Sequence, residues 1–130
     1  MESGLKYLCE DWAENWPESE AGILKALKYG ATDDNIFDVM SALHQQRAFL
    51  WKYENTVCVT MFDGHDYTIW LFSGEMKKAK EMMPFVEKHA AGLDASEVVV
   101  FGRKGWTRSF LASIGYATTH VVMKKDLRGT

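Results

Sequence analysis

The sequence predicts a mixed α/β fold (α+β in some schemes) with elements in the order ααα-βββ-α-β-α-β. Three patterns predict it: helical spacing of apolar residues over 1–47, strand-like runs between turn signals over 48–72, and a strand–helix–strand pattern over 97–127. With 130 residues, 47% of them hydrophobic, the chain is long enough for one domain with a real core. We expect a single domain, helical up to residue 47 and built around a sheet over 48–130.

The N-terminal part carries three helical patterns. Apolar side chains recur at helical spacing over residues 4–16, and Pro17 is expected to end that helix. A second helix is expected over 19–29, and a third should be capped by Thr32 or Asp33. The core face of the third helix would consist of Ile36, Met40 and Leu43. No clear strand is expected before these helices.

Three strands are expected next, over residues 48–54, 56–62 and 66–72. Asn55 marks the first turn, and the Asp63-Gly64 pair is a strong hairpin signal. The first two strands alternate between apolar and polar residues, whereas the third is apolar almost throughout. This pattern predicts an antiparallel meander that leads into a more central strand.

Residues 75–92 are expected to be helical, either with a kink at Pro84 or with the helix beginning near it, since proline suits a first turn. The residues expected to face the sheet are Phe85, Val86, His89 and Ala90. A buried strand is then expected over 98–101, a helix over 106–114 and an extended return over 118–123.

This C-terminal pattern resembles a known family. A short helix that ends in a Gly-aromatic pair (Gly115-Tyr116) and leads into the last strand is similar to the C-terminal half of the GNAT acyltransferase superfamily. The variant here, GRKGWTRSFLASIGY closing on VVMKKDL, most resembles the small GNAT-like proteins of tailed bacteriophages. The resemblance is good over 97–127, fair over 48–96 and poor before that.

The resemblance implies a GNAT-like, mainly antiparallel sheet with helices on both faces. The helices before residue 47 would then lie near the acyl-acceptor site. Two departures stand out: no clear first strand precedes these helices, and the helix after the third strand would be delayed if it began at Pro84.

In an active GNAT enzyme, a glycine-spaced loop and the following helix N-terminus hold the pyrophosphate of acetyl-CoA. The matching cofactor-binding candidates here are Phe72, Ser73, Gly74, Glu75, Met76 and Lys77. Only Gly74 supplies a glycine, and Glu75 puts a carboxylate where a phosphate would sit. The lysines that could compensate are Lys77, Lys78 and Lys80, but such a run is more often a solvated face. We therefore expect a weakened or lost pyrophosphate site.

The general-acid position also departs from the family pattern. The resemblance places an acidic tyrosine four residues before Gly115, where this chain has Leu111. Ser113 is nearby but is a poor acid, and Tyr116 is most simply a core residue. The tyrosines that could reach the site only if the fold brings them there are Tyr53 and Tyr67.

A general base for an amine would be a carboxylate or histidine, and the candidates are Glu54, Asp63, His65 and Asp66. The last three fall in the expected hairpin turn, where turn geometry alone explains them. His89 and His120 are isolated and are more often structural. Histidines and cysteines show no metal-ligand spacing. We name no catalytic residue and no metal ligand.

The best local candidate for an interaction surface is a basic-aromatic cluster formed by Arg103, Lys104, Trp106 and Arg108. Trp106 could stack on a base or acyl group, and an arginine could bind phosphate. The alternative, which we prefer, is that Trp106 anchors the turn to the core while the arginines pair with surface carboxylates. A net charge of −3 argues weakly against a nucleic-acid binder.

Cys9 and Cys58 make no disulfide framework, and both are expected to be packed thiols, although a pair between them stays open. The N-terminus lacks the pattern of a signal peptide, and no segment approaches the roughly 18 apolar residues of a membrane span. We expect a protein of the host cytoplasm, or one that is assembled there into a virion.

Two functions follow from the resemblance. The first is a degenerate GNAT-fold protein of bacteriophage origin that serves as a structural or interaction component, in particle assembly or in contact with a host protein. The alternative is an N-acetyltransferase that moves an acetyl group from acetyl-CoA directly to an amine. That enzyme would need the backbone of residues 73–76 to hold phosphate and a water molecule to replace the acid.

Overall fold

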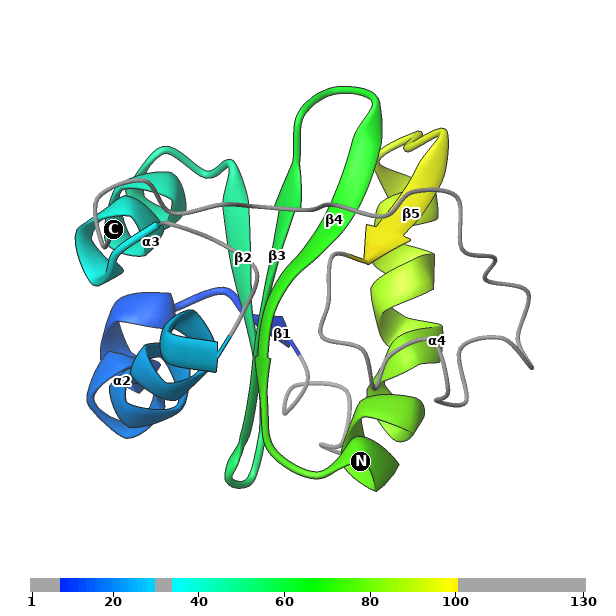
Figure 1. Cartoon of the computed structure of the whole chain (residues 1–130). Coiled ribbons are helices and arrows are strands. Elements are labelled where there is room, and N and C mark those ends of the chain that lie inside the picture. The colour runs from blue at the N-terminus through cyan, green and yellow to red at the C-terminus, as the bar shows by residue number, and fades with distance from the viewer. Residues whose placement is uncertain (1–7, 30–33, 101–130) are drawn as a thin grey trace, which may run out of the picture.

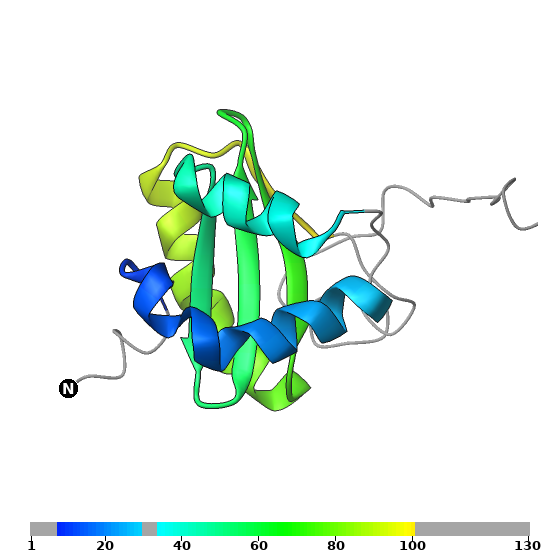
Figure 2. The ribbon, with the colours of Figure 1, turned by 90° about the vertical axis from the view of Figure 1, so that its left-hand side faces the viewer.

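The structure, a computed structural model, describes residues 8–29 and 34–100 (Figure 1). These residues form one five-stranded sheet between two helical layers. Helices α2 (Trp12–Tyr29) and α3 (Ile36–His44) lie side by side on one face, and α4 (Met76–Gly92) covers the other (Figures 1 and 2). The predicted α/β class, a mainly antiparallel sheet with helices on both faces, is confirmed.

Strand order in the sheet follows the chain. The strands are β1 (Leu8–Cys9), β2 (Ala48–Tyr53), β3 (Thr56–Phe62), β4 (Asp66–Ser73) and β5 (Glu97–Val100). The first four pair antiparallel, whereas β5 runs parallel to β4 after the α4 crossover. The predicted strands over 48–54, 56–62 and 66–72 are therefore confirmed to within one residue.

The sheet separates two apolar cores. The core under α4 contains, among others, Trp51, Cys58, Ile69, Met82 and Val86. The core under α2 and α3 contains, among others, Ile23, Val39, Leu50, Val59 and Leu71. Because β3 supplies side chains to both, all of its first five residues are buried.

A β-bulge in β4 explains why this strand reads as almost continuously apolar. Val59 pairs with Leu71 but Thr60 pairs with Ile69, so Trp70 has no partner across the ladder. One extra residue reverses the alternation of faces along the strand. Ile69 therefore faces α4, Leu71 faces α2 and α3, and Phe72 faces α4 again.

The N-terminal elements differ from the prediction in two ways. Leu8 and Cys9 form a short strand that pairs with β2, so a strand does precede the helices. The two helices expected over 4–16 and 19–29 are, in the described residues, the single helix α2, which continues through Pro17. Proline removes one backbone hydrogen bond there, and burial of one face of α2 outweighs that loss.

Close packing holds α2 on the sheet. At Gly22 a Cβ atom would lie 3.3 Å from a methyl carbon of Val57, so the helix backbone approaches the sheet closely there. Ser19 is fully buried and donates its hydroxyl to the carbonyl of Asn15 at 2.8 Å. The helix thus buries a polar side chain without leaving it unpaired.

Helix α3 is capped by Asn35, not by Thr32 or Asp33. The Asn35 side chain accepts from the backbone N–H groups of Phe37 and Asp38, at 2.9 and 3.1 Å. Asp38 accepts in return from the Asn35 N–H at 2.8 Å, which completes a capping box. Val39, Ala42 and Leu43 are its buried residues, so of the three predicted core positions only Leu43 is fully buried.

Helix α4 begins directly after β4 and runs through Pro84. Val86 and Ala90 are buried against the sheet as predicted, and His89 is half-buried among aromatic rings. Phe85 was expected to face the sheet but is 40% exposed, because the helix turns its side chain to the outer side. The elements predicted over 106–114 and 118–123 lie outside the described residues.

Candidate functional site

The turn between β4 and α4 holds the residues predicted to bind a cofactor. Gly74 has φ of +141°, a conformation that favours glycine. A Cβ at Gly74 would lie 2.5 Å from Thr56 Oγ1 and 2.8 Å from Thr56 Cα. The glycine is therefore required by the close approach of β3. Glu75 occupies the N-cap position of α4, and its side chain makes no capping hydrogen bond.

Two carboxylates flank this helix end. Lys78 Nζ lies 2.8 Å from a carboxylate oxygen of Glu54 and 3.4 Å from one of Glu75. It also donates to the Asn55 side chain at 3.0 Å and lies over the Tyr53 ring. Its hydrogen bond to Glu54 raises the pKa of Lys78, and Glu75 adds to this effect. One ammonium thus serves two carboxylates, so Lys78 is already engaged by Glu54 and Glu75 at this end of α4.

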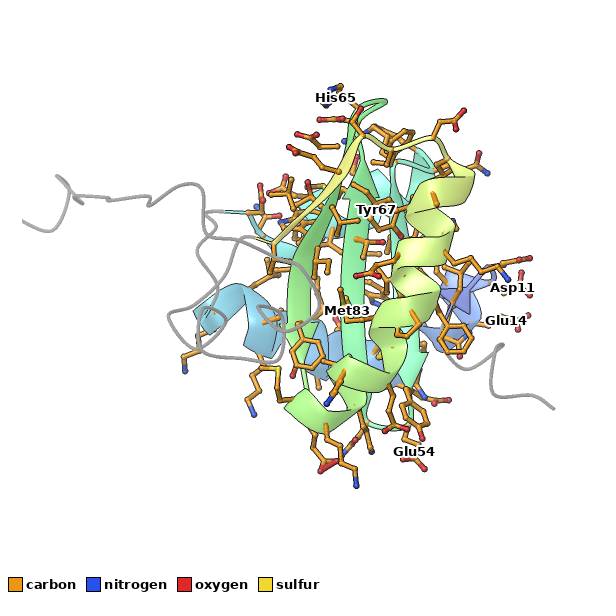
Figure 3. All side chains as sticks on the ribbon, turned by 90° about the vertical axis from the view of Figure 1, so that its right-hand side faces the viewer. Asp11, Glu14, Glu54, His65, Tyr67 and Met83 are labelled. Atoms are coloured by element: carbon orange, nitrogen blue, oxygen red, sulfur yellow. The ribbon has the colours of Figure 1, made fainter. Side chains whose placement is uncertain are left out.

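A buried chain of polar side chains connects the sheet to the other half of α4. Trp51 Nε1 donates to Thr60 Oγ1 at 2.9 Å, and Thr60 Oγ1 lies 2.8 Å from the Tyr67 hydroxyl. The Tyr67 hydroxyl lies 2.7 Å from Nδ1 of His89. Figure 3 shows Tyr67 beside α4, at the opposite end of the sheet from Glu54.

The hydrogen bonds that link these four side chains have one arrangement in which every N–H and O–H between them has an acceptor. Indole N–H can only donate, so Thr60 accepts from Trp51 and is free to donate to Tyr67. Tyr67 then donates to His89 Nδ1, which requires a neutral imidazole with its proton on Nε2. This arrangement makes His89 the final acceptor.

Burial supports the neutral state of these groups. Ring centroids of Phe49, Trp51 and Tyr67 lie 4.7, 5.7 and 5.5 Å from that of His89. Removal from water lowers the pKa of His89 and raises the pKa of Tyr67 well above its usual value. Burial likewise raises the pKa of the Cys58 thiol to about 12, so this cysteine is not a nucleophile at neutral pH.

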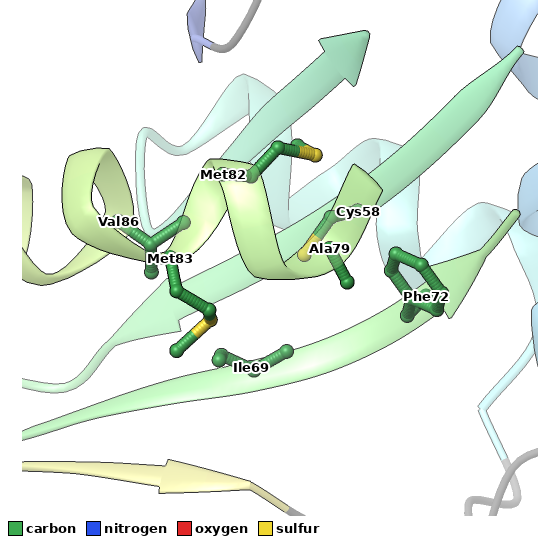
Figure 4. Close-up of a pocket in the computed structure, with 7 residues that line it drawn as sticks. All are labelled: Cys58, Ile69, Phe72, Ala79, Met82, Met83 and Val86. Atoms are coloured by element: carbon green, nitrogen blue, oxygen red, sulfur yellow. The ribbon is translucent and has the colours of Figure 1, made fainter. Parts of the chain in front are cut away.

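A small apolar gap lies under the first half of α4 (Figure 4). Its free volume is about 10 Å³, which is about one water-sized sphere. The residues that line it are Cys58, Ile69, Phe72, Ala79, Met82, Met83 and Val86. With no polar lining group, the gap offers no partner to a water molecule or a polar ligand.

The general-base candidates are not brought together. Asp63 accepts from the backbone N–H groups of His65 and Asp66, at 2.8 and 2.7 Å, and these bonds lower the pKa of Asp63. His65 pairs with Asp66 at 2.7 Å on the exposed hairpin. Their role in turn geometry is confirmed. Glu54 lies at the far end of the sheet (Figure 3).

The other predicted sites divide between described and undescribed residues. Phe72 is buried in the α4 core, while Met76 and Lys77 lie on the exposed start of α4. The interaction cluster and the acid-position residues lie outside the described part: Arg103, Lys104, Trp106, Arg108, Leu111, Ser113 and Tyr116.

The sequence interpretation missed the polar chain. Two signals could have indicated it: Thr60 is a polar residue within an apolar run, and His89 lies on the apolar face of its helix. Linking them requires knowledge of register, because Trp51 and Tyr67 reach Thr60 diagonally from neighbouring strands. Spacing along the chain does not contain that information.

No protein-family model matches this sequence, and a comparison with curated proteins finds no relative. Within residues 8–29 and 34–100, no cluster of three or more His, Cys, Asp or Glu side chains could hold a metal ion. None of the helices in these same ranges has the length and apolar content needed to cross a bilayer.

Proposed function

We propose that this chain is a degenerate GNAT-fold protein of bacteriophage origin that acts in the host cytoplasm or on the virion. Its role would be that of a structural or interaction component, in contact with particle components or a host protein. The proposal rests on the sequence resemblance, on the arrangement of elements and above all on the two carboxylates that engage Lys78 at the start of α4.

The arrangement of elements supports the GNAT part of the proposal. The sequence suggested two departures from the family pattern, a missing first strand and a delayed helix after the third central strand. Neither departure is present: β1 precedes α2, and α4 begins at Met76, directly after the Gly74-Glu75 turn. These features raise the weight of the resemblance over the part of the chain before residue 97.

The single observation that carries the loss of catalysis is the pair of carboxylates at the N-terminus of α4. A bound pyrophosphate would need positive charge and free N–H groups at this end. Here Lys78 is already shared by Glu54 and Glu75, at 2.8 and 3.4 Å. Glu75 also carries its charge at the N-cap itself, where it competes with an anionic ligand for the helix dipole.

An exposed aromatic side chain supports a role in protein contact. Phe37, in the first turn of α3, is 74% exposed, although the capping box fixes its backbone firmly. A large apolar side chain on a rigid helix end suits an anchor for a partner surface. Leu24 on the same helical layer is 47% exposed.

Titration calorimetry with acetyl-CoA, with plain CoA as the control ligand, tests the loss of the cofactor site. We expect no binding heat from the wild-type protein even at millimolar ligand. A double substitution, Glu54→Gln with Glu75→Gln, should bring weak binding into the measurable range because it frees Lys78. The matched control is Glu81→Gln, an exposed carboxylate further along α4. Micromolar binding by the wild type would overturn the proposal.

The alternative, an acetyl-CoA-dependent N-acetyltransferase, is favoured by one observation. The start of α4 follows the Gly74 turn directly, and the resemblance would put the cofactor phosphate at such a helix start. If acetyl-CoA binds, release of CoA thiol in the presence of a panel of amines would measure transfer. Thiol release that depends on an amine would establish the enzyme.

The structural role has its own assay. Immunoblots of particles purified on a density gradient would show whether the chain is part of the virion. Its presence at a fixed ratio to the capsid protein supports particle assembly. Its absence from particles, together with no complex in cross-linked host cells, would contradict both forms of the proposed role.

A further inference from the structure

Helix α4 consists of two halves that meet at Pro84. Proline has no N–H, so the bond to the carbonyl of Lys80 is missing at the centre of the helix. The first half is held firmly, by Lys78 on the Glu54-Asn55 turn and by buried Ala79, Met82 and Met83. Because this hydrogen bond is missing, α4 can bend at Pro84 more easily than elsewhere along its length.

The second half of α4 is attached to the sheet by packing and by a side-chain hydrogen bond, and in the turn that follows it the Ser96 N–H donates to the His65 carbonyl at 2.8 Å. Val86 and Ala90 pack against the sheet, and the hydrogen bond from Tyr67 to His89 ties the helix to the polar chain of β2, β3 and β4. All three hydrogen bonds of this polar chain form together only when His89 accepts from Tyr67. The hydrogen-bonded part of this attachment therefore depends on the charge of one imidazole ring.

Protonation of His89 would break this arrangement. Nδ1 would then carry a hydrogen and could no longer accept from Tyr67. Tyr67 would have to turn its own hydrogen to Thr60, which already accepts from Trp51. The Thr60 hydroxyl hydrogen would then lose its partner in the chain. A buried donor without a partner and a cation among three rings both disfavour the position in which the second half of α4 packs on the sheet.

No described charged group offsets this cost. From β3 and β4 the titratable groups on this face are Cys58 and Tyr67, and burial keeps both neutral. From β2 the side chains on this face are Phe49, Trp51 and Tyr53, of which Tyr53 lies under Lys78 at the other end of α4, whereas Lys52 pairs with Glu18 on the α2 side. From β1 the neighbour is Leu8, and from β5 they are Val98 and Val100. On α4 itself Lys88 is exposed and Glu87 is half-buried, and burial alone accounts for the lowered pKa of His89.

We propose that the second half of α4 is a pH-sensitive latch. Neutral His89 holds residues 85–92 on the sheet, and its protonation lets this half bow away from the sheet between Pro84 and the turn into β5, while the first half and β5 stay in place. Release would uncover the aromatic surface of Phe49, Trp51 and Tyr67. The latch is independent of the proposed function, since it concerns the opposite end of α4 from the carboxylate pair.

The first test is an NMR titration of the histidine rings in the full chain. His89 should show the Nε2–H tautomer at neutral pH and should titrate below the usual histidine pKa of about 6.5. The other tautomer, or titration at or above that usual value, would overturn the latch. The second result would mean that the surrounding rings stabilise the cation.

The second test is hydrogen exchange followed by mass spectrometry at about pH 7.5 and about pH 5, reported as protection factors. Residues 85–92 should lose protection at the lower pH, while residues 76–83 and β3 keep theirs. His89→Gln should abolish this pH dependence, since a glutamine can accept from Tyr67 but does not titrate. His65→Gln is the matched control and should behave like the wild type.

A second variant changes the other partner of this hydrogen bond, so the proposal can still be tested if His89→Gln does not fold. Tyr67→Phe removes the donor but keeps the ring, so residues 85–92 should exchange faster at both pH values with a smaller difference between them. An unchanged pH response in His89→Gln would refute the proposal. So would a loss of protection spread evenly over the whole helix.

Discussion

The same substitution, threonine to valine, should change the free energy of unfolding in opposite directions at the two threonines of β3. Thr56 and Thr60 are both fully buried, two residues to either side of Cys58 on the α4 face. Thr60 Oγ1 bonds to Trp51 and Tyr67, whereas Thr56 Oγ1 has no partner among the described residues. Valine keeps the shape of threonine but replaces the hydroxyl with a methyl group.

The magnitudes follow from what each hydroxyl leaves behind. Thr60→Val leaves the Trp51 N–H unpaired in the core and breaks the chain to Tyr67, which should cost about 2 kcal/mol. Thr56→Val removes an unpaired buried hydroxyl, so it should stabilise the fold by about 1 kcal/mol. The two variants should therefore differ by about 3 kcal/mol in free energy of unfolding.

Urea unfolding, monitored by tryptophan fluorescence and circular dichroism, measures both changes. Midpoints should move in opposite directions while the slopes stay equal, which would show that the unfolded state is unaffected. Equal destabilisation by both variants would refute the reasoning. It would mean that loss of the threonine shape, and not the pairing of its hydroxyl, sets the cost.

Three further predictions concern backbone geometry, capping and pH. Gly74→Ala should destabilise by about 3 kcal/mol or more, since its Cβ would meet Thr56 at 2.5 Å; Gly64→Ala, with φ of +96° and open space, should cost only about 1 kcal/mol in thermal unfolding. Equal costs would exclude the contact as the cause. Asn35→Ala should cost about 1 kcal/mol in the same assay through loss of the cap, and a neutral result would show that the capping box contributes nothing. Since the pKa of His89 is lowered in the fold, stability should fall as the pH drops below about 6.5 and level off below the folded pKa, and His89→Gln should remove this slope.

Local signals predicted the central meander well because its turns are specified locally. The Asp63-Gly64 pair fixes one hairpin and Asn55 marks the other, so β2, β3 and β4 could be placed to within one residue. The class of the fold followed from these strands and from α4.

Elements that depend on tertiary contacts could not be placed in this way. β1 has two residues and exists only through its pairing with β2, so no periodicity could predict it. Proline breaks helices on average, yet packing against the sheet keeps α2 continuous through Pro17. At the candidate site, the carboxylate of Glu75 could be predicted to oppose phosphate, but its sharing of Lys78 with Glu54 depends on a contact between α4 and a hairpin.

The bulge at Trp70 divides β4 into two segments that are out of phase with each other. Before it, odd-numbered residues such as Tyr67 and Ile69 face α4, and after it an even-numbered residue, Phe72, does so. Deleting Trp70 would restore simple alternation and would leave Leu71 and Phe72 on their present faces, because Ile69 and Leu71 already pair with adjacent residues of β3. Homologous chains that lack this residue should therefore keep the side chain aligned with Leu71 on the α2 and α3 face and the next one on the α4 face. A loss of one residue at this point would be tolerated without any exchange of side chains, so distant relatives should be aligned across the centre of the sheet with the gap at Trp70.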